Sequence, residues 1–305
     1  MANNSAKKLA LIKRSTDRHW VGDGFPVRSI FSYRDLAAEL SPFLLMDYAG
    51  PAQFPPTNRR LGVGEHPHRG FETVTIVYDG EVEHRDSSGG GGVIGVGDVQ
   101  WMTAGGGIVH EEFHGPNFRK TGGAFEMIQL WVNLAAKDKL TERGYQGITD
   151  GQIPAVDLPE GAGRARVIAG SYGGKNGPAD TFSPMNVWDL RLKAGKRATF
   201  ALPDGDTTAL FVLKGELRVI EDSATDGKPG QPFGEGELAL FERAGDSIAI
   251  EALSDATVLL LAGTPFDEPV VGHGPFVMNS QAEIRQAVAD YQSGKMGHLT
   301  AQDGA

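Results

Sequence analysis

The segment Thr75-Ile76-Val77-Tyr78-Asp79-Gly80-Glu81-Val82 recurs 135 residues later (75 to 210) as Leu210-Phe211-Val212-Leu213-Lys214-Gly215-Glu216-Leu217. Each copy is an apolar run that ends in a glycine-acid pair, a pattern that predicts a strand followed by a tight turn. A second glycine-acid turn follows each copy, at Gly97-Asp98 and Gly236-Glu237. Two copies of one antiparallel unit predict two similar β-barrels in tandem.

The composition of the whole sequence favours an all-β chain. The 305 residues include 42 Gly and 17 Pro, which indicates many turns between short strands. Helical patterns are limited to a short turn within 33–39 and a helix over 280–292, where Ser280 and Glu283 have capping-box spacing. The clearest strand patterns are 73–78, 125–134, 209–213 and 257–261.

The two barrels predict two domains. We expect residues 1–140 to form an N-terminal domain and 141–305 a C-terminal domain that ends in a helix and tail. The boundary is expected within the polar stretch 137–158. Hairpin insertions are expected at 222–234 and at the glycine run 89–92, which lacks the Lys-Ser/Thr of a phosphate-binding loop.

Charge and cysteine content exclude several classes of function. The formal charge is 29 − 39 = −10, so direct nucleic-acid binding is not expected. The absence of Cys excludes disulfides, thiolate metal sites and a cysteine nucleophile. No apolar run is long enough for a membrane span, and the run 9–12 is too short for a signal peptide. We therefore expect a cytoplasmic protein.

Five of the eight histidines lie between residues 66 and 114, and four residues there have the spacing of metal ligands. His66 and His68 are two apart, as are His110 and Glu112, so each pair projects from one face of an extended strand. Imidazole and carboxylate without sulfur suit Fe(II), Mn(II), Ni(II), Co(II) or Cu(II), with open positions for substrate. Zinc is less favoured, because a closed four-ligand site would be inert. We expect one divalent ion, with Fe(II) preferred.

Four further segments make the chain recognisable: His66-Pro67-His68-Arg69-Gly70-Phe71-Glu72-Thr73-Val74, Gly97-Asp98-Val99-Gln100-Trp101-Met102-Thr103-Ala104-Gly105, Gln129-Leu130-Trp131-Val132-Asn133-Leu134 and His273-Gly274-Pro275-Phe276-Val277-Met278-Asn279. They resemble the pirin family of the cupin superfamily over nearly the whole chain. The resemblance implies an all-β fold of two tandem cupin (jelly-roll) barrels with metal in the first only. It also assigns the ligand role to His66, His68, His110 and Glu112.

Other polar residues near these ligands have alternative roles. In the family that the chain resembles, the position of Glu111 holds a small residue. Strand alternation predicts that Glu111 faces away from the metal. Glu72 occupies the position of a general cupin ligand, but the resemblance implies a place beside the ligands instead. His114 is a weaker fifth candidate, because the strand is expected to end near Gly115. His84 either lines the pocket or forms a cross-strand pair.

The resemblance implies two functions. Pirins are similar to quercetin 2,3-dioxygenases, in which metal and O2 open the ring of a flavonol with loss of CO. Glu112 would then be the catalytic base that accepts the 3-hydroxyl proton. The alternative is a metal-dependent, redox-sensing regulator that binds transcription factors or metabolic enzymes. The partners expected are therefore a flavonol-like molecule and O2, or a protein.

Overall fold

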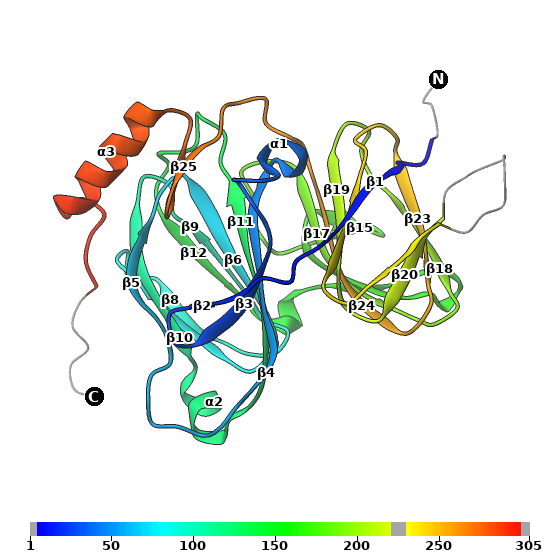
Figure 1. Ribbon diagram of the computed structural model, residues 1–305, viewed down its shortest axis with the longest axis horizontal. Helices are drawn as coiled ribbons and strands as arrows, with labels where there is room; N and C mark the ends of the chain where they lie inside the picture. Colours follow the sequence, from blue (N-terminus) through cyan, green and yellow to red (C-terminus); the bar gives the residue numbers. More distant parts are fainter. Residues whose placement is uncertain (1–4, 221–229, 300–305) are drawn as a thin grey trace. The chain divides into compact units, whose positions relative to one another are not determined.

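The computed structural model describes residues 5–220 and 230–299, so residues 222–229 of the expected insertion lie outside the described residues. The chain divides into two compact units (Figure 1). The N-barrel comprises Thr16–Ala37, Phe43–Asp150 and Phe266–Ala305, and the C-barrel comprises Met1–Ser15, Ala38–Pro42 and Gly151–Pro265. The units therefore differ from the contiguous ranges 1–140 and 141–305. The N-terminal end of the chain belongs to the C-barrel, and the C-terminal end belongs to the N-barrel.

The N-barrel is built from two antiparallel sheets. The larger has the strand order β12-β9-β6-β11-β4-β3-β2, and the smaller has the order β5-β10-β7-β8. The strands are β2 (Arg18–Val21), β3 (Phe25–Ser32), β4 (Phe43–Phe54), β5 (Gly62–His68), β6 (Phe71–Asp79), β7 (Val82–Asp86), β8 (Gly91–Ile94), β9 (Val99–Thr103), β10 (Ile108–His114), β11 (Gly123–Asn133) and β12 (Gly144–Ile148).

The C-barrel repeats this plan. Its sheets have the orders β1-β22-β19-β24-β17-β14-β13 and β18-β23-β20-β21. The strands are β1 (Leu9–Arg14), β13 (Ala155–Asp157), β14 (Gly163–Ala169), β17 (Met185–Leu192), β18 (Arg197–Ala201), β19 (Thr207–Lys214), β20 (Glu216–Val219), β21 (Pro232–Gly234), β22 (Glu237–Phe241), β23 (Ser247–Ala252) and β24 (Ala256–Gly263). A small hairpin is formed by β15 (Ser171–Tyr172) and β16 (Lys175–Asn176).

The sequence repeat corresponds to equivalent backbone in the two barrels. Gly80 and Gly215 both have a φ of 89°, a conformation that L side chains rarely adopt. Gly97 N donates to Val77 O at 2.9 Å, and Gly236 N donates to Val212 O at 2.8 Å. Val77 and Val212 are themselves 135 residues apart. The predicted all-β fold of two similar barrels is confirmed.

Helices are few and short. They are α1 (Ala37–Leu40), α2 (Pro116–Thr121), α3 (Gln281–Gln292) and the 3₁₀ turns η1 (Asp150–Gln152) and η2 (Pro159–Gly161). The predicted C-terminal helix is confirmed as α3, with Ser280 as its N-cap. No helix in the described ranges is long and apolar enough to cross a membrane.

The C-terminal segment belongs to the N-barrel. It forms the hairpin of β25 (Val271–His273) and β26 (Phe276–Met278) and then α3, drawn in orange and red in Figure 1. Arg69, directly after β5, forms a β-bridge with Phe276, and its guanidinium contacts the Asp290 carboxylate at 3.0 Å. Lys139 Nζ, itself buried, donates to the carbonyl oxygens of Gly70 and Val277. The segment thus packs against the end of the strand that carries His66 and His68.

The cap of α3 can be tested by mutation. Ser280 Oγ accepts a hydrogen bond from Glu283 N, and the Glu283 carboxylate accepts one from Asn279 N at 3.1 Å. Ser280→Ala should destabilise the helix by about 1 kcal/mol. Amide hydrogen exchange in α3 should therefore become roughly fivefold faster. Gln281→Ala keeps the cap and serves as the control; equal exchange in the two variants would contradict this role.

Candidate metal centre

The pairing of β5 with β10 brings the histidine pairs together. His66 lies opposite His110, and His68 lies opposite Ile108. The register shifts between His110 and Glu112, where one β10 residue faces two on β5. Such bulges re-aim side chains locally and are frequent beside functional sites. On its other side β10 pairs regularly with β7, with His110 opposite Asp86 and Glu112 opposite His84.

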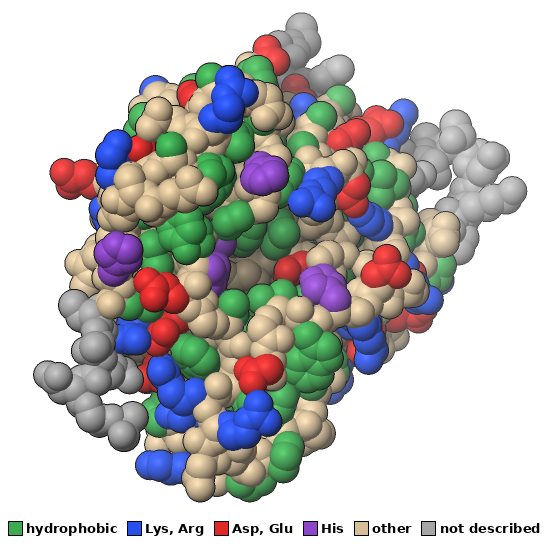
Figure 2. All heavy atoms as spheres, turned by 60° about the vertical axis from the view of Figure 1, so that its left-hand side comes forward, with side chains coloured by type: hydrophobic (Ala, Val, Ile, Leu, Met, Phe, Trp, Pro, Cys, Tyr) green, Lys and Arg blue, Asp and Glu red, His purple; other side chains and the backbone are tan. Residues whose placement is uncertain are grey.

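Three of the four predicted ligands form one group. The candidate ligand atoms of His66, His68 and His110 lie within 4.8 Å of one another. Figure 2 shows a hollow in this face of the molecule with histidine side chains along its wall. His68 and His110 are buried, whereas His66 is partly exposed. His66 is therefore the member of the group that is accessible to solvent.

Backbone contacts orient two of these rings. His66 Nδ1 donates to Gly64 O at 2.8 Å, and His68 Nδ1 faces Pro275 O at 3.4 Å. A ring that donates from Nδ1 has its lone pair on Nε2, which is the nitrogen a metal would use. Pro275 belongs to the C-terminal segment, so that segment helps to orient a candidate ligand.

His110 has an unsatisfied nitrogen. Its Nδ1 lies 3.2 Å from His84 Nδ1, but its buried Nε2 has no hydrogen-bond partner. A buried polar atom without a partner costs free energy, and a metal ion would satisfy it. Burial, followed by the charges of the neighbouring histidines, holds the pKa of both His68 and His110 well below the usual range. Both rings are therefore neutral near pH 7, which is the form that binds metal.

Glu112 lies beside this group. It forms a second, overlapping group with His84 and His110, whose candidate ligand atoms also lie within 4.8 Å of one another. Its Oε1 accepts hydrogen bonds from Gln100 Nε2 at 2.5 Å and from Thr75 Oγ1 at 3.4 Å. Glu112 also lines a cavity of about 40 Å³, together with Val21, Phe25, Val27, Asp47, Met127 and Gln129. His110 connects the two groups.

Glu111 faces the opposite way, as alternation predicts. Its carboxylate accepts hydrogen bonds from Arg85 Nε at 2.6 Å and Arg60 Nη2 at 3.2 Å. It is in neither of the two groups that could hold a metal among the described residues. The extra carboxylate therefore forms ion pairs on the outer side of the strand.

The expected place of Glu72 beside the ligands is wrong. Thr75 contacts Glu112, and Glu72 is three positions away on the regularly paired strand β6, so it projects from the other face of the sheet. Its Oε1 accepts a hydrogen bond from Thr103 Oγ1 at 2.7 Å. Burial raises the pKa of Glu72 to about 7. The motif position alone does not reveal this change of face.

The other two histidines have different surroundings. His114 is buried at the end of β10, its Nε2 donates to Gly24 O at 2.8 Å, and its ring packs against those of Phe54 and Phe125. It is outside both groups. His84 lies opposite Glu112 across the β7–β10 pair and also lines the interior beside His110.

Sequence reasoning did not identify several polar residues that surround the ligands. They are Thr75, Asp86, Gln100 and Tyr145. Thr75 lies in the strand predicted over 73–78, where period-two alternation would have placed it on the inner face. Gln100 lies in the segment 97–105, which was identified only by its resemblance to the family. Tyr145 could not have been found, because it comes from β12, which pairs with β9. Burial, then the charges of Glu112 and Asp86, raises the pKa of Tyr145 to about 12.

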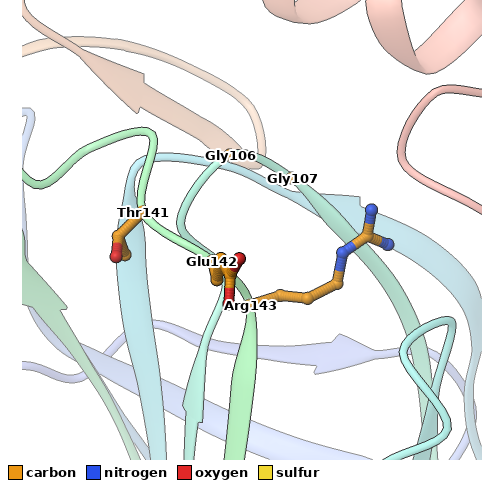
Figure 3. A pocket seen from close by; sticks show the side chains of 5 residues that line it. All are labelled: Gly106, Gly107, Thr141, Glu142 and Arg143. Atoms are coloured by element: carbon orange, nitrogen blue, oxygen red, sulfur yellow. The ribbon is translucent and has the colours of Figure 1, made fainter.

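A second, polar groove of about 400 Å³ lies outside the candidate ligands. It is lined by Gly106, Gly107, Thr141, Glu142 and Arg143. In Figure 3 the Arg143 side chain extends away from Glu142. Its Nη1 donates to Met296 O at 2.9 Å and to Ser87 Oγ at 3.2 Å. Arg143 therefore supports the turn after β7.

The C-barrel carries apolar side chains where the N-barrel carries ligands. Its strands β18 and β23 correspond in sheet order to β5 and β10. Their buried residues are Ala198, Phe200, Ile248, Ile250 and Ala252. All eight histidines of the sequence belong to the N-barrel. The described part of the C-barrel contains no group of possible metal ligands.

The N-barrel donor set fits a single metal ion. It supplies neutral imidazoles, a carboxylate at the rim of a cavity, and one buried nitrogen that nothing else satisfies. Imidazole and carboxylate ligands without sulfur are typical of first-row divalent ions.

Comparison with known proteins places the chain. A family model described as Pirin matches residues 24–132, and one described as Pirin C-terminal cupin domain matches residues 187–297. The chain is 55% identical over 289 residues to a "Putative quercetin 2,3-dioxygenase" of Pseudomonas aeruginosa, with 95% of this chain and 98% of that protein covered. It is 36% identical over 306 residues to Pirin-1 of Arabidopsis thaliana, with 98% of each covered.

A solved structure is similar over the same extent. The crystal structure of a quercetin 2,3-dioxygenase from Acinetobacter baumannii is 49% identical to this chain with a TM-score of 0.91. The match covers 97% of this chain and 100% of that one. The chain therefore belongs to the pirin family, and its two barrels are the tandem cupin domains of that family.

Proposed function

We propose that this chain is a metal-dependent dioxygenase that opens the ring of a flavonol-like substrate. One divalent ion, Fe(II) in the first instance, would be held by His66, His68, His110 and Glu112. The observation that carries the proposal is the buried Nε2 of His110, which lacks a partner and belongs to the same group as His66 and His68. The names of the Pseudomonas and Acinetobacter relatives support the substrate class.

A bound divalent ion would supply Lewis acidity and one-electron redox chemistry for the reaction with dioxygen. The protein supplies the base. Glu112 lies at the cavity and can accept the proton of the flavonol 3-hydroxyl group. Gln100 and Thr75 donate to its Oε1, which fixes the carboxylate in place and leaves Oε2 as the proton acceptor.

The cavity walls suit the reacting edge of an aromatic substrate. Phe25, Val27 and Met127 are apolar residues that line it. At about 40 Å³ it is too small for a whole flavonol, since pockets for such ligands measure roughly 300–1,000 Å³. The rest of the substrate would therefore lie outside this cavity.

The metal content should be one equivalent per chain. Histidines belong to the N-barrel alone, and the corresponding strands of the C-barrel bury apolar side chains. Elemental analysis of the purified protein should give at most about one equivalent of divalent metal. Two firmly bound equivalents would contradict the expectation that only the N-barrel holds metal.

His68→Ala should abolish tight metal binding and leave the fold intact. The barrel is closed by its own strand hydrogen bonds, unlike a zinc finger that folds only with metal. Chelator competition should show the loss of affinity. Thermal unfolding followed by circular dichroism should remain cooperative, both in this variant and in chelator-treated wild type. Loss of the cooperative transition on chelation would refute this independence of fold and metal.

Glu112→Gln should slow flavonol cleavage by about 10²–10⁴-fold, because Gln cannot accept the proton. The assay follows quercetin and O2 consumption together in protein loaded with Fe(II). Glu111→Gln is the matched control, since Glu111 contacts Arg85 and Arg60 on the outer side of the same strand.

The reverse result, with Glu111→Gln inactive and Glu112→Gln active, would mean that the assignment of the base is off by one residue. If no metal form of the wild type consumes a flavonol, the role as a metal-dependent protein-binding regulator replaces the enzymatic one.

A further inference from the structure

Behind His110 lie two side chains that the proposed chemistry does not use, Asp86 and His84. Asp86 Oδ2 lies 3.3 Å from His84 Nε2, and His84 Nδ1 lies 3.2 Å from His110 Nδ1. All three residues are buried, with the side chains of His84 and Asp86 both at 0% exposure. Asp86 lies opposite His110 in the β7–β10 pairing, so all three hydrogen-bonded side chains are on the inner face of one sheet.

The direction of these hydrogen bonds follows from the carboxylate. An ionised Asp86 can only accept, so His84 Nε2 carries the hydrogen and donates it. The lone pair of a neutral His84 is then on Nδ1, which accepts from His110 Nδ1. His110 consequently has its lone pair on Nε2, the buried atom that has no partner within the protein.

The opposite arrangement is disfavoured. If His84 Nδ1 donated to His110 Nδ1, a neutral His110 would carry its hydrogen on Nε2. That N–H would be buried without an acceptor, and it would also block metal binding. The direction of these hydrogen bonds therefore decides whether His110 Nε2 is available as a ligand.

Asp86 is held in its accepting state by the turn that follows β7. Its Oδ1 accepts from Ser88 N at 2.7 Å, Ser88 Oγ at 2.5 Å and Gly90 N at 3.1 Å, which leaves Oδ2 for His84. Burial would raise the pKa of Asp86, but the hydrogen bonds of His84 and Ser88 outweigh it and lower the pKa below its usual value.

The glycine run and two neighbouring side chains preserve this geometry. A Cβ at Gly90 would lie 2.6 Å from Asp86 Oδ2. The Tyr145 ring stacks on His84, with centroids 5.0 Å apart and planes inclined by 17°. Arg143, labelled in Figure 3, donates to Ser87 Oγ at the start of the turn. Gly90 thus makes room for the buried Asp86 carboxylate.

We propose that Asp86 and His84 are positioning residues that set the tautomer of His110 and so prepare its Nε2 for the metal. Neither residue binds the ion. The inference rests on the proposed metal site and not on the proposed reaction with flavonols.

Asp86→Asn tests the direction of the hydrogen bonds between Asp86, His84 and His110. The Asn carbonyl can accept from Ser88 N and Gly90 N, and its NH2 group then faces His84 Nε2 as a donor. His84 is forced to donate from Nδ1, and His110 must carry its hydrogen on Nε2. In the metal-free protein, ¹⁵N NMR of the imidazoles should show the His110 hydrogen on Nδ1 in wild type and on Nε2 in the variant. Affinity for Zn(II), measured against a chromophoric chelator, should fall by about 10–100-fold.

The matched control is Glu83→Gln, which changes a carboxylate to an amide on the same strand. Glu83 contacts Arg60 on the outer face, so the His110 tautomer and Zn(II) affinity should match wild type. An Asp86→Asn protein with the wild-type tautomer would overturn the inference, whether its affinity is kept or lost. Wild type that fails to bind Zn(II) would instead refute the metal site.

If Asp86→Asn does not fold, His84→Phe tests whether His84 sets the tautomer of His110. Phe retains a ring for stacking on Tyr145 but cannot accept from His110 Nδ1. The His110 hydrogen should then distribute between its two nitrogens, and Zn(II) affinity should fall by a similar factor. A single Nδ1–H tautomer with unchanged affinity would show that His84 only fills space.

Discussion

The antiparallel pairing of β5 with β10 is the constraint on which the rest of the site depends. It places His66 opposite His110, although the two residues are 44 positions apart in the chain (66 to 110). The bulge that follows interrupts the register just before Glu112, while the regular pairing with β7 continues past it. One strand therefore presents His110 to two groups of partners, the histidines of β5 and the polar side chains of β7. A pair of histidines on an isolated strand would have neither group of partners.

The two barrels show how the same backbone plan supports different interiors. Both have a four-stranded sheet with the same strand order, and both use glycines of identical φ at the repeated turn. In the C-barrel this sheet buries Phe200, Ile248 and Ile250. In the N-barrel it buries histidines and carboxylates, whose burial is tolerated because hydrogen bonds satisfy most of their polar atoms. Among the described residues of this sheet His110 Nε2 remains unsatisfied, and this atom carries the proposal of a metal site.

The C-terminal segment completes the N-barrel. Arg69 and Lys139 are buried cations that are satisfied by oxygen atoms of the segment and its surroundings, including Asp290, Gly106 O, Asn133 Oδ1 and Val277 O. Burial lowers the pKa of Lys139 to about 8. Removing the segment would take Asp290 away from Arg69 and Val277 O away from Lys139, and the loss of partners from buried charges is costly in a protein interior. The segment therefore stabilises the residues directly after His68.

Much of this protein could be predicted from its sequence because strand alternation is a local property. The repeat around Gly80 and Gly215 predicted two barrels, and spacing by two placed His66 with His68 and turned Glu111 outward. The capping box predicted α3 for the same local reason. Tertiary structure alone decided what depends on strand pairing: the face of Glu72, the exchanged chain ends, and the approach of Asp86, His84 and Tyr145 to His110. Pairing partners and bulges are set by the packing of distant segments, so no local pattern encodes them.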